Sequence, residues 1–356
     1  MSSQIMKSYR IHWIDIAKGI CIISIVIGHV YHNSFIRTYA LSFDVPMFFF
    51  LSGLCYRKPD DSIEYFINKI KRVVVPYFSF SLISILVFAV AGRIMPQISN
   101  IMNCSLEDNI LVMLWGNSKP DVMKYNSPLW FLTCYFSVLV LAFIVEKIVD
   151  FLRNVRYVRE IIIICLILIG GGYSTPSITL PWHLETAVSM LVWLELGITF
   201  KEKKLFDRSI KFKNVIIVIF LVVGALLGFI NRDIIKTSLQ VRQDIYGVHV
   251  LYYLGAFFGI MGFSLLSQRI GKNKILEYCG RNSLSILVVH KFPVLFFQEL
   301  FPPTKAALVD SNSIVGISTG IIVMAISIVL SLIVCNVIKR VCPLVLGEKK
   351  INKSSK

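Results

Sequence analysis

Long apolar runs recur from one end of the chain to the other, and short polar or basic segments separate them. Apolar residues make up 56% of the 356 residues, charged residues only 16%, and the mean hydropathy is +0.71. A soluble domain carries about a quarter charged residues. The excess of apolar side chains therefore needs a lipid bilayer as its solvent. The sequence predicts an all-α, polytopic integral membrane protein.

A membrane-spanning helix needs roughly 20 residues at about 1.5 Å each. Ten apolar runs approach that length, although the second, fifth and sixth are short. They lie at 11–31, 43–57, 76–95, 128–147, 160–176, 184–200, 214–231, 247–267, 282–300 and 314–338. We therefore expect about ten transmembrane helices, with nine or eleven as alternatives. They form one membrane domain at residues 1–345, followed by a polar cytoplasmic tail at residues 346–356.

The distribution of Lys and Arg predicts the orientation, because cytoplasmic loops carry an excess of both. If the N-terminus is cytoplasmic, 27 of the 37 Lys and Arg residues fall in segments on that side. Eight fall on the opposite side, and Lys18 and Lys291 lie inside spans. The bias alternates at nearly every loop. We therefore expect both termini in the cytoplasm.

The basic charge and the cysteines exclude other classes of protein. A net charge of +16 suggests nucleic-acid binding in a soluble protein, but here the basic residues sit in short loops between spans. They cannot form one basic face, so we expect no nucleic-acid partner. None of the eight cysteines forms a C-x-x-C pair, and most lie within apolar runs. We interpret them as buried apolar side chains and expect no metal site.

Ionisable side chains interrupt the first apolar run at Asp15, Lys18 and His29. Such groups are costly in hydrocarbon unless they are paired or hydrated. At about 100° per residue, Lys18 and His29 project within roughly 20° of each other, and Asp15 can pair with Lys18. One interpretation is a charged stripe that lines an internal path, with His29 about 16 Å deeper than Lys18. The other is a structural ion pair, with a histidine satisfied by a neighbouring helix.

This segment also resembles the start of the acyltransferase-3 family of membrane O-acyltransferases, in which a basic residue is followed ten residues later by Gly-His. Four further segments match family patterns in the correct order, so that the resemblance covers about residues 10–340. They are 46–53 (F-F-x-L-S-G), 72–77 (R-x-x-x-P-Y), 128–132 (L-W-F-L) and 280–290 (G-x-N-S-L-x-I-Y-x-x-H). The branch it resembles most is that of the fucose O-acetylase-like proteins. Lys18 stands where many members carry Arg, and Leu287 stands where Tyr is common.

The resemblance implies a reaction and its partners. Family members take an acyl group, usually acetyl, from cytoplasmic acyl-CoA and transfer it to a hydroxyl of a surface polysaccharide or a lipid-linked sugar. The expected location is the plasma (inner) membrane of a bacterium, in contact with membrane lipids. Acetyl-CoA is then a donor substrate, and no bound cofactor is expected.

The resemblance also assigns roles within the first span. His29 is the expected base for the sugar hydroxyl, or the group that passes the acyl unit on. Lys18 attracts the phosphates of the donor or steadies a carbonyl oxygen. Asp15 holds Lys18 or helps to position the site, and a purely structural role for Asp15 is equally open.

Six residues outside the first span complete the predicted site. Arg72 and Tyr77 are assigned to the donor, although Arg72 also serves as a topology signal and Tyr77 as a residue that starts a helix. Four residues are assigned to the sugar substrate, namely Ser52, Trp130, Glu195 and His290. Each also has a structural interpretation. Ser52 can permit close helix packing, and Trp130 can anchor the protein at the membrane interface. Glu195 and His290 can pair with other buried groups. In particular, Glu195 can pair with Lys291 or His290.

Two other functions remain open at this point. A transporter or flippase would use Asp15, Lys18 and His29, together with Glu195, as a proton relay. A scaffold in a glycan-assembly complex would need none of these groups for chemistry. The ordered series of five motifs favours the acyltransferase.

Overall fold

A computed structural model describes residues 11–32, 34–94, 105–117, 124–172 and 179–348. These residues form α-helices and short helical turns, and their β-structure is limited to one isolated bridge between Gln240 and Ile245. The all-α class predicted from the sequence is confirmed. Each of the ten apolar runs contains or overlaps a helix.

The helices are given with the bounds that the structure shows. The first half contains α1 (His12–Val30), α2 (Phe35–Leu54), α3 (Ser62–Lys69), α4 (Val75–Ile94), α6 (Leu106–Trp115), α7 (Trp130–Phe151) and α8 (Val158–Gly172). The second half contains α9 (Leu184–Glu202), α10 (Lys213–Ile235), α11 (His249–Ile270), α12 (Lys274–Arg281), α13 (Ser283–Val289), α14 (Lys291–Leu300), α15 (Pro302–Val309) and α16 (Ile314–Val341). A π-helical turn, Ile70–Val74, joins α3 to α4, and a 3-10 turn, Lys124–Leu129, precedes α7.

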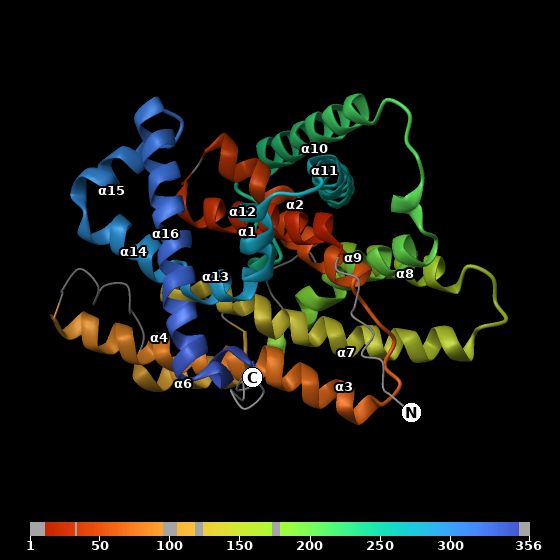
Figure 1. The fold of residues 1–356 in the computed structure, drawn as a ribbon, viewed down its shortest axis with the longest axis horizontal. Helices are drawn as coiled ribbons and strands as arrows, with labels where there is room; N and C mark the ends of the chain where they lie inside the picture. The colour runs from red at the N-terminus through yellow and green to blue at the C-terminus, as the bar shows by residue number, and fades with distance from the viewer. Residues whose placement is uncertain (1–10, 33, 95–104, 118–123, 173–178, 349–356) are drawn as a thin grey trace, which may run out of the picture.

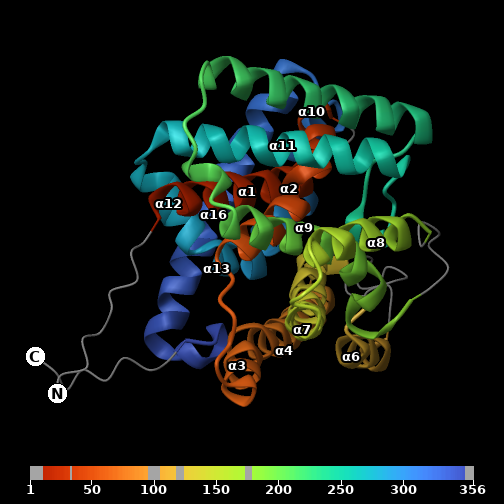
Figure 2. The same cartoon turned by 90° about the vertical axis from the view of Figure 1, so that its right-hand side faces the viewer.

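Helices α1 and α2 lie in the middle of the molecule. Figures 1 and 2 show α10 and α11 on one side of them and α3, α4, α6 and α7 on the other. Helix α9 packs against α2, and α12 packs against α1. Segments from both halves of the chain therefore surround α1, the helix that carries the predicted catalytic residues.

Seven helical segments within the described residues are long and apolar enough to cross a membrane, so the protein is a multi-pass membrane protein. The predicted count of about ten is not confirmed, because α2, α8 and α9 are absent from this set. Helix α8 has only 15 residues. Helices α2 and α9 are long enough, but they bury polar side chains such as Asp44 and Glu195. Such side chains fit a helix that faces protein rather than lipid.

The N-terminal caps explain where several helices begin. Asp61 accepts hydrogen bonds from the backbone N–H groups of Ile63 and Glu64. At α6, Ser105 and Asp108 bond to each other's backbone N–H groups in a capping box, and Gly116 ends the helix in the left-handed conformation. A Ser at the N-cap with an acidic residue three positions later is a common helix start, which explains why α6 begins here.

Glycines let α2 and α9 approach closely. A Cβ atom added to Gly53 would lie 2.0 Å from the carbonyl oxygen of Leu194, and one added to Gly197 would lie 2.1 Å from that of Phe50. Because the two glycines face each other's backbone, no larger side chain fits at either position. This contact fixes α2, whose side chains line both cavities described below.

Substitution of Gly53 by Ala should therefore destabilise the protein. The added methyl group has only backbone atoms in front of it, so the helices must move apart, at a cost of about 1–3 kcal/mol. Thermal melting of the purified protein in detergent micelles measures the loss. Gly255→Ala is the matched control, because its nearest neighbour is a side-chain atom at 3.4 Å. Equal melting temperatures for the Gly53 and Gly255 variants would contradict the close contact.

Candidate active site

Two cavities lie next to α1, and they share two lining side chains, Phe131 and Leu287. The larger cavity, of about 730 Å³, contains Lys18 on its wall, and we name it the basic cavity. The smaller, of about 110 Å³, contains His29, and we name it the His29 cavity. Phe131 and Leu287 are both buried and stand between the two spaces, so we name this pair the partition.

The basic cavity owes its name to its charged lining. Among the described residues that line it, five are basic and one, Asp15, is acidic. The basic residues are Lys18, Arg57, Lys69, Arg72 and Arg281. They come from α1, the α2–α3 connection, α3, the π-helical turn and α12. Five separate segments therefore direct positive charge into one space, which favours an anionic ligand.

Close packing of α1 on α12 brings part of this lining together. A Cβ atom on Gly280 would lie 1.9 Å from the carbonyl oxygen of Asp15, and one on Gly19 would lie 2.1 Å from that of Leu276. Arg281, which directly follows Gly280, is thereby held beside α1. The amine of Lys18 lies 3.7 Å from the sulfur of Cys55, at the end of α2.

Aromatic stacking holds one side of the partition in place. The ring of Phe131 stacks on that of Tyr135, with centroids 5.8 Å apart and planes 8° from parallel. The ring of Phe49 also contacts that of Phe131, with centroids 5.3 Å apart. The hydroxyls of Tyr135 and Ser52 are 2.6 Å apart and share a hydrogen bond. Ser52 lines the basic cavity and thus supports Phe131 only through Tyr135, while the adjacent Gly53 serves the close helix packing.

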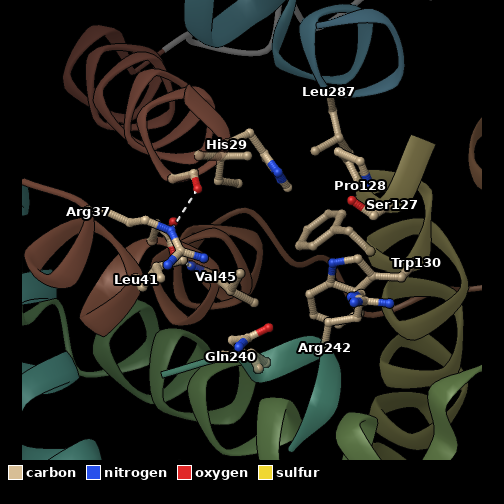
Figure 3. A pocket seen from close by; sticks show the side chains of 15 residues that line it. His29, Arg37, Leu41, Val45, Ser127, Pro128, Trp130, Gln240, Arg242 and Leu287 are labelled. Carbon is tan, nitrogen blue, oxygen red and sulfur yellow. Dashed lines mark hydrogen bonds between the residues drawn. The ribbon is translucent and has the colours of Figure 1, made fainter. Parts of the chain in front are cut away.

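The His29 cavity has a different lining. Figure 3 shows the ring of His29 entering it from α1, with Trp130 and Arg242 on the opposite wall. Arg37 donates from Nε to the carbonyl of Gly28 and from an Nη to the hydroxyl of Ser238, both at 3.0 Å. Trp130 is buried, with 9% of its surface exposed, and therefore serves as a cavity wall.

His290 stands at the junction of α13 and α14, where the backbone remains helical. Pro293 has no N–H to donate to the carbonyl of Val289, four residues earlier, which weakens the helix at this junction. The Nδ1 atom of His290 lies 2.9 Å from the carbonyl of Ile286 and must donate to it, which leaves Nε2 as an acceptor. The ring centroids of His29 and His290 are 5.2 Å apart.

The two histidines have the chemistry of proton-transfer groups. His290 is fully buried, and within the part of the chain that the structure describes its Nε2 atom has no hydrogen-bond partner. The ring of His29 likewise makes no hydrogen bond to the described residues and is open to the cavity. An imidazole with a free lone pair next to a small cavity can accept a proton from a hydroxyl bound there.

Three predicted site residues line neither cavity: His290, which contacts the ring of His29 from behind the lining, Tyr77 and Glu195. The structure does not bring Tyr77 to the basic cavity: its hydroxyl donates to the carbonyl of Met113 at 2.9 Å and anchors α6 on α4. The expected pairing of Glu195 with Lys291 or His290 is wrong. Glu195 pairs with Arg159 instead, and it lines neither cavity.

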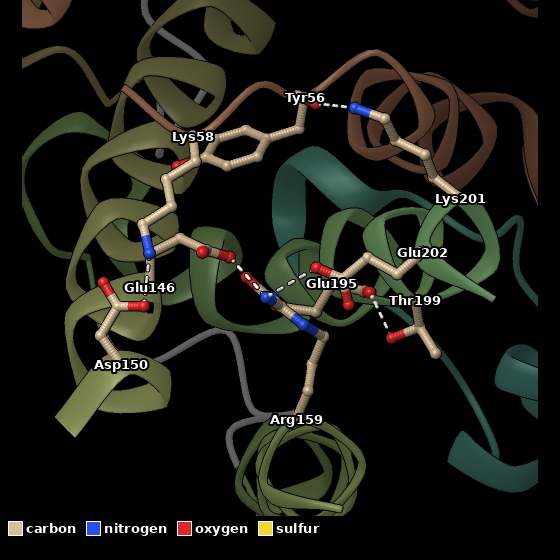
Figure 4. Close-up of polar contacts among 9 residues, drawn as sticks. All are labelled: Tyr56, Lys58, Glu146, Asp150, Arg159, Glu195, Thr199, Lys201 and Glu202. Atoms are coloured by element: carbon tan, nitrogen blue, oxygen red, sulfur yellow. Dashed lines mark hydrogen bonds and ion pairs between the residues drawn. The ribbon is translucent and has the colours of Figure 1, made fainter. Parts of the chain in front are cut away.

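The cluster around Arg159 joins α7, α8 and α9, as Figure 4 shows. Its guanidinium contacts Glu195, lies 2.7 Å from Glu146 and lies 3.4 Å from Glu202. Arg159, Glu146 and Glu195 are all buried. A buried charge without a partner is strongly destabilising, so the cluster explains why Glu195 stands inside an apolar run.

Sequence reasoning missed three contributors to the cavities. Arg37 and Arg242 were counted only as loop cations on the side with few positive charges, and Phe131 was noted only as part of a motif. The signal for the two arginines was their position, because cations on that side oppose the charge bias. Phe131 carried no chemical signal, because its role comes from contact with helices that are distant in sequence.

Comparison with known proteins fits this geometry. The sequence profile of the acyltransferase-3 family, described as an acyltransferase domain, matches residues 11–340. The chain belongs to the acyltransferase-3 family. No curated protein and no solved structure matches it. The family assignment makes the chain a membrane acyltransferase, while the fucose O-acetylase-like branch stays a prediction.

The transporter alternative receives no support from the family match. Glu195, the fourth group of its proposed proton relay, is held by Arg159 between α8 and α9, whereas His29 lies beside His290. Glu195 therefore does not share a path with His29.

Glu195→Gln tests whether this carboxylate is structural. The substitution removes charge from a buried ion pair and should lower the free energy of unfolding by about 3 kcal/mol. Acyl transfer per folded molecule should stay unchanged, because Glu195 lines neither cavity. Thermal melting and activity on the same samples check both effects. Glu202→Gln is the control: its side chain is 57% exposed, so its loss should cost less than about 1 kcal/mol. A stable but inactive Glu195 variant would return this residue to the active site.

Proposed function

We propose that this acyltransferase takes an acyl group, most simply acetyl, from acyl-CoA in the basic cavity. It transfers that group to a sugar hydroxyl in the His29 cavity. The observation that carries the proposal is the shared partition of Phe131 and Leu287, on which a cation-lined space and a histidine-lined space meet. A donor and an acceptor bound on its two sides have their reacting ends next to each other.

The basic cavity suits the donor. Coenzyme A carries several phosphate charges, and Lys18, Arg72 and Arg281 stand on different walls of a space of about 730 Å³, within the usual range for ligand pockets. The positive-inside count assigns Arg72 and Arg281 to the cytoplasmic side, where acyl-CoA is present. Arg57 and Lys69 add to the same charge. In contrast, Lys58 pairs with Asp150 and is not part of the lining.

The roles of Lys18 and His29 are separated by distance along α1. Eleven residues at about 1.5 Å each put their Cα atoms about 16 Å apart. Lys18 lines only the basic cavity, so of its two expected roles the geometry favours binding of donor phosphates over contact with the reacting carbonyl. His29 lines only the cavity on the far side of the partition.

The reaction then proceeds by general-base catalysis. His29 takes the proton of the acceptor hydroxyl as its oxygen attacks the thioester carbonyl. The new C–O bond forms, the C–S bond breaks, and the thiolate of coenzyme A receives the proton. His290 lies close enough to orient the ring of His29, since their centroids are 5.2 Å apart.

The acceptor and the acyl group follow from the shape of the His29 cavity. Trp130 offers an aromatic wall on which a sugar ring can stack. The small volume of this cavity, about 110 Å³, supports a short acyl group such as acetyl. We therefore assign a polysaccharide or a lipid-linked sugar as acceptor, on the outer side of a bacterial plasma membrane.

His29→Ala should lower glycan acylation by about a hundredfold or more, because the general base is lost. Release of acetate from surface polysaccharide by mild alkali, in cells carrying the variant or the wild type, measures the effect. His12→Ala is the matched control on the same helix. His12 pairs with Glu277 at a side-chain exposure of 50% and lines neither cavity. Undiminished acetate with the His29 variant present at normal membrane levels would remove His29 from the mechanism.

Substitution of Lys18 or Arg72 by Ala should weaken use of the donor. Loss of one charge-assisted contact to a phosphate should raise the KM for acetyl-CoA about tenfold and leave the KM for the acceptor unchanged. Initial rates with radiolabelled acetyl-CoA in membrane vesicles separate the two constants. Lys58→Ala removes a cation from the same side and should have no effect. An unaltered KM for acetyl-CoA in the Lys18/Arg72 double variant would refute the donor assignment.

A further inference from the structure

We infer that the acceptor sugar carries an anionic group, a carboxylate or a phosphate, which Arg37 and Arg242 hold beside His29. The inference rests on the proposed function and specifies its acceptor. It starts from the charge of the His29 cavity, whose described lining includes two arginines and one carboxylate, that of Asp44.

The positions of these arginines are unusual for their side of the membrane. Only 8 of the 37 Lys and Arg residues fall in the segments assigned to the outer side, and two of those 8 line this one small cavity. Positive charge on that side opposes the orientation of the protein. Because Arg37 and Arg242 oppose this bias and line the same cavity, we expect them to have a function there.

The cations also act directly on His29. Lys291, Arg37 and Arg242 all lie close enough to its ring to interact with it electrostatically. The one acidic lining residue, Asp44, is buried and accepts a hydrogen bond from the backbone N–H of Val45 at 2.6 Å. Among the described residues that line the cavity, two are basic and one is acidic. In a space of low dielectric, an anion bound beside such cations is strongly attracted to them.

The two guanidinium groups are held in a fixed arrangement. Arg37 uses Nε and one Nη atom on Gly28 and Ser238, which leaves its other nitrogen to face a ligand. Arg242 lies in the 3-10 turn Val241–Gln243, which the backbone bridge between Gln240 and Ile245 closes. Figure 3 places Arg242 next to Trp130. A planar cation beside an aromatic wall can bind the charged group of a sugar while the wall receives its ring.

An anionic acceptor would also assist the chemistry. When His29 takes the hydroxyl proton, it becomes a fourth cation among Lys291, Arg37 and Arg242. Repulsion then opposes proton transfer unless negative charge lies nearby. An acceptor with a carboxylate or phosphate brings that charge with it. A neutral sugar would therefore lose turnover as well as binding.

Mass spectrometry of the acylated glycan tests the inference. Surface glycans and lipid-linked sugars are prepared from a strain that lacks this protein and from its parent, and the residue that loses its acyl group is identified. A uronic or other sugar acid at that residue supports a carboxylate as the recognised group, and a phosphorylated residue supports phosphate. A neutral residue overturns the inference and leaves the proposed function standing. No difference between the strains overturns both.

Variants of Arg242 provide a second test of the inference. Restoring the deleted strain with Arg242→Gln should lower acylation at least tenfold, and Arg242→Lys should recover part of it, because the charge returns without the planar fork. Lys305→Gln is the control. It removes an outer cation that pairs with Glu299 at 2.8 Å and lines neither cavity, so acylation should be unchanged. Wild-type acylation with Arg242→Gln would overturn the inference.

Discussion

Ionisable side chains inside a membrane protein must be paired or must face water, and this constraint organises the whole molecule. Arg159 is fully enclosed and is surrounded by carboxylates, so it serves the packing of three helices. Lys18 faces the large basic cavity. His29, Arg37 and Arg242 face a much smaller one. The way in which each charge is satisfied thus separates structural groups from groups that are available to a ligand.

The partition explains how a reaction can connect two sides of a membrane without opening a channel. Phe131 and Leu287 are apolar and buried, and the stacking of Phe131 on Tyr135 limits its movement. Water is poorly accommodated between such side chains, so a thioester that reaches them is protected from hydrolysis. In the proposed reaction the same two apolar side chains would also limit the passage of ions between the cavities.

The sequence predicted what depends on local pattern. Apolar length located the helices, and helical periodicity placed Lys18 and His29 on one stripe of α1. It failed where a partner comes from a distant helix. Glu195 was expected near His290, but its true partner, Arg159, lies on α8, and no spacing rule connects them. For Arg242 the charge bias marked an unusual cation, but a cation in a short loop gives no sign of whether it faces solvent or a cavity.

Residues that shape the backbone bring the predicted side chains together in the site. Pro293 removes one backbone hydrogen bond where α13 meets α14, next to the buried His290, whose ring lies beside that of His29. Gly280 lets α12 approach α1 so closely that Arg281 reaches the wall of the basic cavity. Neither residue has a reactive side chain. Because the reacting groups are few and their spacing is fixed by such contacts, a change in backbone approach would separate donor and acceptor as effectively as the loss of a side chain.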